Sequence, residues 1–140
     1  MMPIVNGSVN IYQDVDLSLT ESVVAPVVHV RQYDDRARKV RCTLYSNHLE
    51  YQVPQEAILM YLGTRPDGCI FQYSTENASN DKIALDEENH IILTVTEYMT
   101  EVAGRYPVDV VLLDSNDDVL GSFSFILSVE AAAGRVGANG

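Results

Sequence analysis

Apolar and polar residues alternate with a period of two along most of this chain, the pattern of β-strands with one buried and one solvent-facing side. Val40, Cys42 and Leu44, for example, are separated by Arg41 and Thr43. The same alternation occurs in residues 15–19, 28–30 and 123–129. Such strands bury their apolar sides by packing one sheet against another.

Further strands are predicted where apolar residues run together. Residues 57–62 are apolar on both sides, which predicts a central strand covered on both faces. Residues 91–95 and 108–113 are further apolar runs, and another strand starts at Cys69. We therefore expect about eight or nine short strands.

Turn-forming residues separate these strands. Arg65-Pro66-Asp67-Gly68 is a hairpin sequence, because proline presets its φ angle and glycine accepts a positive one. Residues 114–118 make a second polar connection between two strands.

One segment has helical character: residues 96–104 start with Thr96 as an N-cap and end at a glycine, which allows two turns at most. The pattern predicts an all-β fold, an antiparallel immunoglobulin-like β-sandwich of about eight or nine strands with one short helical connection.

The length of 140 residues suits one domain. We assign residues 1–130 to the sandwich and the small, Gly-rich residues 131–140 to a tail or the start of a linker. The N-terminus lacks the basic and apolar regions of a signal peptide. No apolar run approaches the roughly 20 residues of a transmembrane helix, so we expect no membrane insertion.

The charge of the chain excludes some classes of binding partner. Asp and Glu number 20 against 9 Lys and Arg, a formal net charge of −11. This argues against nucleic acid and anionic membranes, which need clustered Lys and Arg. The acids fall on strand faces, as at Asp14 and Asp16, and in loops 86–88 and 114–118. That placement predicts a solvated coat that keeps the sandwich soluble.

The two cysteines, Cys42 and Cys69, are too few for a disulfide framework. We expect free thiols that face the core. A bridge between two sheets requires Cα atoms within about 7 Å, which the sequence leaves open. Without a CxxC motif or a histidine at ligand spacing, we expect no zinc site.

A calcium loop is the first metal candidate. Asp114, Asn116 and Asp118 match the first three ligand positions of an EF-hand, but Val119 and Phe125 replace the required Gly and Glu. We interpret this segment as a hairpin loop, and residues 86–88 as a solvated acidic loop. We expect neither a metal nor a cofactor.

Catalytic patterns are equally weak. There is no GxSxG elbow and no Gly-rich phosphate loop. His29 and His90 are predicted on strands and His48 in a turn, as surface residues. A Cys42–His29 pair is disfavoured because the two side chains are expected on opposite strand faces. We therefore expect that this chain is not an enzyme.

The chain has eight tyrosines and no tryptophan, and the tyrosines are candidates for a binding face. Tyr33, Tyr45, Tyr51 and Tyr73 flank turns or fall on strand faces. Interfaces use tyrosine, but tyrosines in a sandwich more commonly pack at the rim of the core.

One corner has a specific pattern. Gln32, Asp34, Ala37 and Arg38 follow the order Q-x-D-x-x-[SA]-R between two strands, and the second strand ends in Leu44. Three later features follow in order: the hairpin at 65–68, a strand and short helix ending in glycine over 91–104, and a closing strand with Phe123, Phe125, Leu127 and Val129.

In this order and spacing, over roughly residues 10–130, the chain resembles the N-terminal domain of phage baseplate upper proteins. One departure is Ser46-Asn47-His48-Leu49, where a glycine-containing turn is expected.

The resemblance implies a non-enzymatic attachment module in virions of tailed phages that infect Gram-positive hosts, assembled in the host cytoplasm. The sandwich would dock onto the baseplate core, and a helical linker would carry receptor-binding proteins that hold the host surface. It also implies a homotrimer. The same sandwich could serve as a capsid head-fibre anchor or decoration protein.

Two other functions stay open. A carbohydrate-binding β-sandwich that recognises host glycans predicts exposed tyrosines clustered beside polar groups. A small enzyme or metal-dependent adhesin predicts carboxylates that converge in a cleft. We also expect the N-terminal run up to Ser22 to pair with a neighbour, because Met1 to Gly7 has little core of its own.

Overall fold

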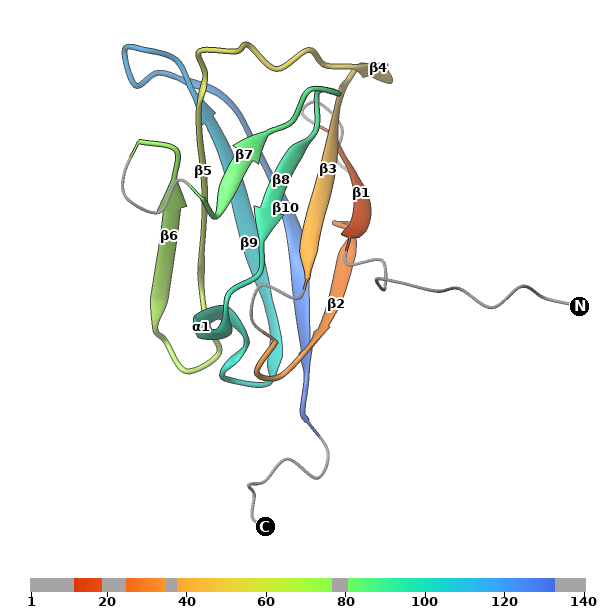
Figure 1. The fold of residues 1–140 in the computed structure, drawn as a ribbon, viewed down its shortest axis with the longest axis vertical. Helices are drawn as coiled ribbons and strands as arrows, with labels where there is room; N and C mark the ends of the chain where they lie inside the picture. Colours follow the sequence, from red (N-terminus) through yellow and green to blue (C-terminus); the bar gives the residue numbers. More distant parts are fainter. Residues whose placement is uncertain (1–11, 19–24, 35–37, 77–80, 133–140) are drawn as a thin grey trace, which may run out of the picture.

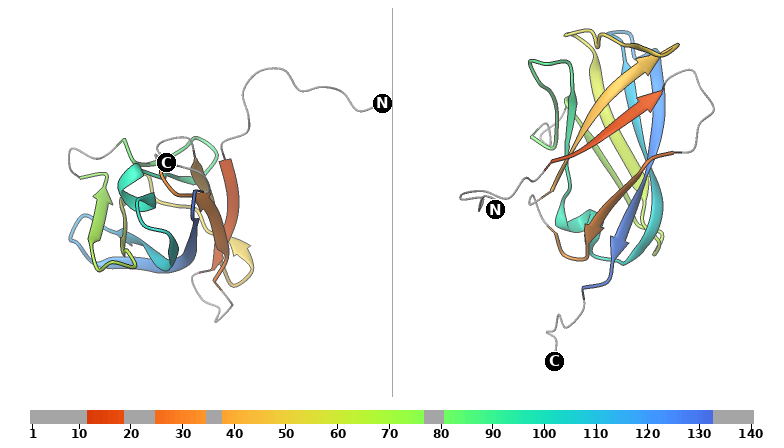
Figure 2. Two further views of the ribbon diagram at one scale, coloured as in Figure 1. Left: turned by 90° about the horizontal axis from the view of Figure 1, so that it is seen from below. Right: turned by 90° about the vertical axis from the view of Figure 1, so that its right-hand side faces the viewer.

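The computed structural model describes residues 12–18, 25–34, 38–76 and 81–132. In these residues, ten strands and one helical turn build two five-stranded sheets that pack face to face (Figures 1 and 2). The predicted all-β sandwich is confirmed. The described residues contain no helix long and apolar enough to cross a membrane.

We call the two layers sheet A and sheet B. Sheet A has the order β1 (Tyr12–Ser18), β3 (Lys39–Ser46), β8 (Ile91–Thr94) and β7 (Ile83–Leu85), and the short β4 (Leu49–Glu50) also pairs with β3. Sheet B has the order β2 (Val27–Arg31), β10 (Val119–Glu130), β9 (Gly104–Leu113), β5 (Ile58–Thr64) and β6 (Ile70–Ser74).

Both sheets are mixed, whereas the sequence predicts antiparallel pairing throughout. Strand β1 runs parallel to β3, and β2 runs parallel to β10. These are edge strands, and no tight hairpin joins either to its partner, so no turn forces the pair to be antiparallel. Alternation reports which face a side chain occupies and carries no information on strand direction.

Strand β5 is covered on one face instead of two. Leu59 and Tyr61 are buried between the sheets, but Met60 and Leu62 on the opposite face are partly exposed. The prediction of a fully covered central strand is therefore wrong: β5 lies next to the edge strand β6, and its second apolar side belongs to the outer face of sheet B.

Two strands are too short for alternation to reveal. Strand β4 has two residues and β7 has three. The β3–β4 hairpin forms without the expected glycine because Asn47 and His48 take positive φ values of 52° and 66°. A two-residue hairpin turn of this kind requires positive φ at both central residues.

Three tyrosine hydroxyls attach the helical turn α1 (Glu97–Thr100) and the residues before it to the core. Tyr61 donates to the Thr94 carbonyl, Tyr106 donates to the Met99 carbonyl at 2.9 Å, and Tyr73 lies 2.9 Å from the Thr96 hydroxyl. Their rings pack with Phe71 in one aromatic cluster. Burial raises the pKa of Tyr61 and Tyr106, which keeps both hydroxyls protonated as donors.

The predicted N-cap is confirmed, because the Thr96 side chain accepts a hydrogen bond from the Met99 N–H. The helix is a single turn with Glu101 as its C-cap. The prediction that a glycine ends the helix is wrong, because Gly104 is the first residue of β9.

A Tyr61→Phe variant should lose about 1 kcal/mol of unfolding free energy, because the buried Thr94 carbonyl loses a donor while the ring stays. Urea unfolding followed by circular dichroism measures the change. Tyr45→Phe on β3 is the matched control, since Tyr45 is partly exposed, and it should unfold like the wild type. Equal unfolding midpoints for all three proteins would contradict the anchoring role.

Candidate functional site

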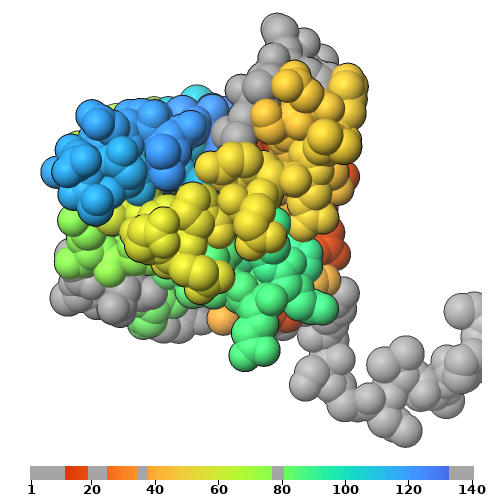
Figure 3. Space-filling view, turned by 90° about the horizontal axis from the view of Figure 1, so that it is seen from above, coloured from red at the N-terminus to blue at the C-terminus, as the bar shows by residue number. Residues whose placement is uncertain are grey.

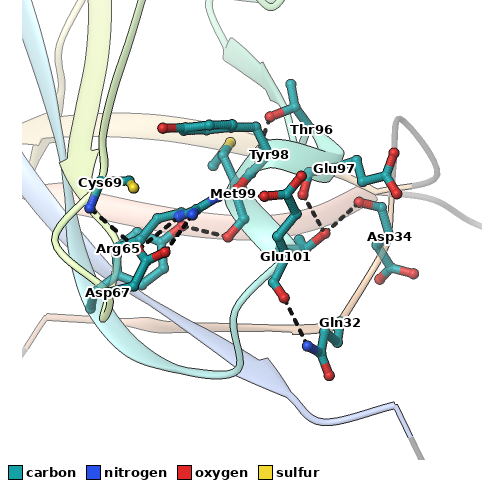
Figure 4. Close-up of polar contacts among 12 residues, drawn as sticks. Gln32, Asp34, Arg65, Asp67, Cys69, Thr96, Glu97, Tyr98, Met99 and Glu101 are labelled. Carbon is teal, nitrogen blue, oxygen red and sulfur yellow. Dashed lines mark hydrogen bonds and ion pairs between the residues drawn. The ribbon is translucent and has the colours of Figure 1, made fainter. Parts of the chain in front are cut away.

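Three of the sequence motifs meet at one end of the sandwich. Strand β10 finishes there and the chain continues to Ala132, so we call this the exit end (Figure 1). The corner that follows β2, the hairpin at 65–68 and α1 surround this point (Figure 4). The motifs are far apart in sequence, and the fold brings them together.

Gln32 ties the exit strand to α1. Its side-chain Nε2 donates to the Glu101 carbonyl at 2.7 Å, and its Oε1 accepts from the Ala132 N–H at 3.3 Å. Its backbone N–H donates to the Glu130 carbonyl at 2.7 Å. Gln32 thus connects the end of β10 and Ala132 to the C-cap of α1.

The corner continues along α1. Tyr33 N–H donates to the Thr100 carbonyl at 3.1 Å, and the Thr100 hydroxyl donates to the Asp34 carbonyl at 2.7 Å. The Asp34 carboxylate accepts from the Arg31 N–H at 3.0 Å and lies 3.8 Å from Arg38. Ala37, the remaining corner residue of the motif, lies outside the described residues.

Arg65 joins the hairpin to α1 from the other side (Figure 4). Its guanidinium makes two hydrogen bonds to the Asp67 carboxylate and also donates to the Tyr98 carbonyl and the Glu101 carboxylate, both at 2.8 Å. It lies 4.4 Å from the centre of the Tyr98 ring, and Arg65 is only 7% exposed. These hydrogen bonds lower the pKa of Asp67 to about 2.

The predicted hairpin is confirmed, with the Gly68 N–H donating to the Arg65 carbonyl at 2.9 Å and Gly68 at φ 91°. Gly104 follows α1 at φ 141°, and a Cβ atom there would lie 2.8 Å from Pro66 Cγ. The exit end therefore needs glycine for both conformation and space. The Arg65 guanidinium at this end bonds to protein groups of both the hairpin and α1.

The two cysteines are free and differ in exposure. Cys42 is buried on β3, and burial raises the pKa of its thiol. Cys69 is exposed, so the expectation that both thiols face the core is wrong for Cys69. It lies in the hairpin just before β6 begins, where the alternation of the strand does not yet apply.

A thiol reagent such as iodoacetamide should modify one cysteine of the folded chain, Cys69, and both in denaturant. The exposed thiol meets the reagent, whereas Cys42 is buried and stays protonated. Mass spectrometry of tryptic peptides measures the result. Rapid modification of Cys42 under native conditions would contradict the placement of β3.

The histidines lie apart. His29 is exposed on β2, and its backbone N–H and carbonyl both bond to the Gln13 side chain. His48 lies in the β3–β4 turn. Cys42 faces the core from sheet A and His29 faces outward from sheet B, so they form no pair.

His90 lies just before β8, not on a strand as predicted, and its Nδ1 is 3.0 Å from an Asp86 oxygen. Asp86, Glu88 and His90 place one ligand atom each within 4.8 Å of one another, a grouping that the loop fold creates and that the sequence does not predict. The Asp86 carboxylate accepts from the N–H groups of Glu88 and His90, so these contacts build the loop itself.

The segment that partly matches a calcium loop is the predicted hairpin loop between β9 and β10. The Asp114 carboxylate accepts from the N–H groups of Asn116 and Asp118, at 2.8 and 3.0 Å. The Asp114 N–H donates to the Asp118 carbonyl at 2.9 Å, which closes the loop.

The four candidate tyrosines do not share a face. Tyr33 lies at the exit end, Tyr45 is near the far end of β3, and Tyr51 and Tyr73 pack against the core. Of the N-terminal run up to Ser22, β1 pairs with β3 of its own chain, and Met1 to Gly7 lie outside the described residues.

No protein-family model matches the sequence, and no curated protein matches it. Among solved structures, the N-terminal domain of phage TP901-1 ORF48 aligns with a TM-score of 0.61 at 13% identity. The alignment covers 85% of this chain and 98% of that domain. The two chains share a fold.

Proposed function

We propose that this chain is a non-enzymatic structural protein of a tailed-phage virion. It docks on the baseplate core and, through the chain that leaves at Ala132, carries receptor-binding proteins. The observation that carries the proposal is the exit end, where Gln32 bonds to Ala132 and Arg65 bonds to α1, in a fold shared with a phage domain. A module that transmits force between a virion core and a host receptor needs such a rigid connection.

A homotrimer is part of the proposal, as is a location in the virion. Mass photometry of the full chain, and of the chain within detergent-released baseplates, measures the copy number. Three copies per assembly unit support the trimer, and a constant single copy contradicts it.

Deletion of the first eight residues tests the proposed pairing of the N-terminal run, because assembly with other virion proteins should weaken.

The position in the particle separates the alternatives. We expect gold-labelled antibodies against this chain to bind the tail tip of intact phage particles in electron micrographs. Label on the capsid would support the head-fibre anchor or decoration protein instead. Absence of the chain from purified particles, by mass spectrometry, would contradict any virion role. Binding of the isolated chain to a glycan array would support the carbohydrate-binding alternative.

A further inference from the structure

The outer face of sheet B carries an apolar surface at the end opposite the exit end. The register aligns Ile58, Leu113 and Val119 in one row across β5, β9 and β10, and pairs Met60 with Val111 in the next row. Leu62 follows in the third row. We call these six residues the apolar face. All six are at least partly exposed, and Val119 is 62% exposed.

The outer face of sheet A has the opposite character. Asp14 and Asp16 on β1 are exposed, and Asp14 forms an ion pair with Arg41 on β3. On sheet B the first two rows hold no charged residue, and Asp109 in the third row accepts a hydrogen bond from Ser124. Depletion of charge with exposed aliphatic residues and methionine is typical of an interface core.

The apolar face leads into a hollow. Residues of β5, β6 and β9, among them Leu62, Ile70 and Pro107, surround a volume of about 320 Å³ with a mostly apolar lining. Ile70 at its border is 72% exposed. A hollow of this size accepts a partner's side chain, and anchoring side chains in such pockets contribute most of the binding energy of many interfaces.

The loops at the end of the sandwich where the apolar face lies are acidic, and we call them the acidic rim. Segments 46–58, 86–90 and 113–120 lie together at this end (Figure 3) and contain no Lys or Arg. They hold the carboxylates Glu50, Glu56, Asp86, Glu87, Glu88, Asp114, Asp117 and Asp118. The exit end instead pairs its acids with Arg65 and Arg38. The acidic rim predicts the charge of the partner.

We propose that the apolar face is the surface with which this chain docks, and that its occupant is an apolar patch of another virion protein bordered by Lys and Arg. A second copy of this chain fits less well, because it would bring the same acidic rim and a further net charge of −11. The proposal deepens the proposed function and rests on it. Val119 starts β10 and Glu130 ends it, so docking at the Val119 end leaves Ala132 outside the contact.

Phage particles assembled without this chain provide the test. Purified wild-type chain, radiolabelled during expression so that no surface carries an added group, should bind them saturably. The double variant Met60→Gln/Val111→Thr removes apolar surface at nearly constant volume and should weaken binding at least tenfold. Asp117→Asn/Asp118→Asn should slow association several-fold at low salt, with less effect at 0.5 M salt.

Matched controls lie on other surfaces. Ile92→Thr makes the same kind of change on the outer face of sheet A, and Asp16→Asn removes an exposed acid on β1. Both should bind within twofold of wild type, and all variants should unfold within a few degrees of it. If the double variant binds like wild type, or Ile92→Thr weakens binding equally, the docking face is wrong while the proposed function stands.

Two outcomes of other kinds are also decisive. If the wild-type chain forms a dimer in analytical ultracentrifugation that Met60→Gln/Val111→Thr dissociates, the occupant is a second copy and the proposal is overturned. If the wild-type chain does not bind the particles, the proposed function fails and the docking inference fails with it.

Discussion

Replacing Arg65 with methionine should lower the free energy of unfolding by about 2–3 kcal/mol. Methionine keeps much of the side-chain volume but removes the donors that hold Asp67, the Tyr98 carbonyl and the Glu101 carboxylate. The carboxylates lie at the surface and regain water, which keeps the cost below that of a fully buried pair. Urea unfolding monitored by circular dichroism measures the loss.

Arg105→Met is the matched control, because Arg105 is exposed on β9. It should change the unfolding free energy by less than about 0.5 kcal/mol. Equal effects of the two substitutions would contradict the role of Arg65 in joining the hairpin to α1. Hydrogen exchange adds a local readout, since the amides of α1 should exchange faster in Arg65→Met.

The pH dependence follows from Asp67. Arg65 lowers the pKa of Asp67 to about 2, below its ordinary unfolded value of about 3.9. The contribution of Asp67 to stability is therefore complete above pH 4 and is lost as the pH falls towards 2. Asp67→Asn should be less stable than wild type at pH 6, and the two unfolding midpoints should converge near pH 2. A gap that stays constant over this range would contradict the pairing.

The second large effect concerns Gly104. Gly104→Ala should cost about 2–4 kcal/mol, because alanine strains the backbone at φ 141° and its Cβ would lie 2.8 Å from Pro66 Cγ. Gly68→Ala is the comparison, since Gly68 also has a positive φ but has open space around it. It should cost about 1 kcal/mol. Thermal unfolding of the two variants separates contact from strain.

A double-mutant cycle isolates the contact itself. Removing the proline ring with Pro66→Ala should restore about 1 kcal/mol of the loss in Gly104→Ala, because the clashing Cγ is gone. Strictly additive effects would show that the hairpin does not press on Gly104, and the packing of the exit end would then be wrong.

Periodicity in the sequence predicts which face of each strand is buried, and the structure agrees for β1, β2, β3 and β10. It carries no information on pairing direction, so the parallel β1–β3 and β2–β10 pairs are invisible to it. It also treats an apolar residue as buried. The run 57–62 is apolar on both sides, and only the layer order shows that Met60 and Leu62 face outward.

The exit end illustrates a second limit. Gln32, Asp67 and Gly104 stand out as motif residues, but their roles depend on partners far away in sequence: Gln32 contacts Glu101 and Ala132. The sequence marks Arg65 only as part of a hairpin, although its guanidinium makes the hydrogen bonds that join this hairpin to α1 and its C-cap. Spacing along the chain cannot reveal such contacts, because the sheet order creates them.

A cryo-electron microscopy map of the intact phage particle tests the central claim most directly. The map should contain this sandwich at the tail tip, with the apolar face of sheet B against the baseplate core and Ala132 pointing towards the receptor-binding proteins. A sandwich that sits on the capsid, or one whose outer face of sheet B is open to solvent while another surface contacts the core, would contradict the account.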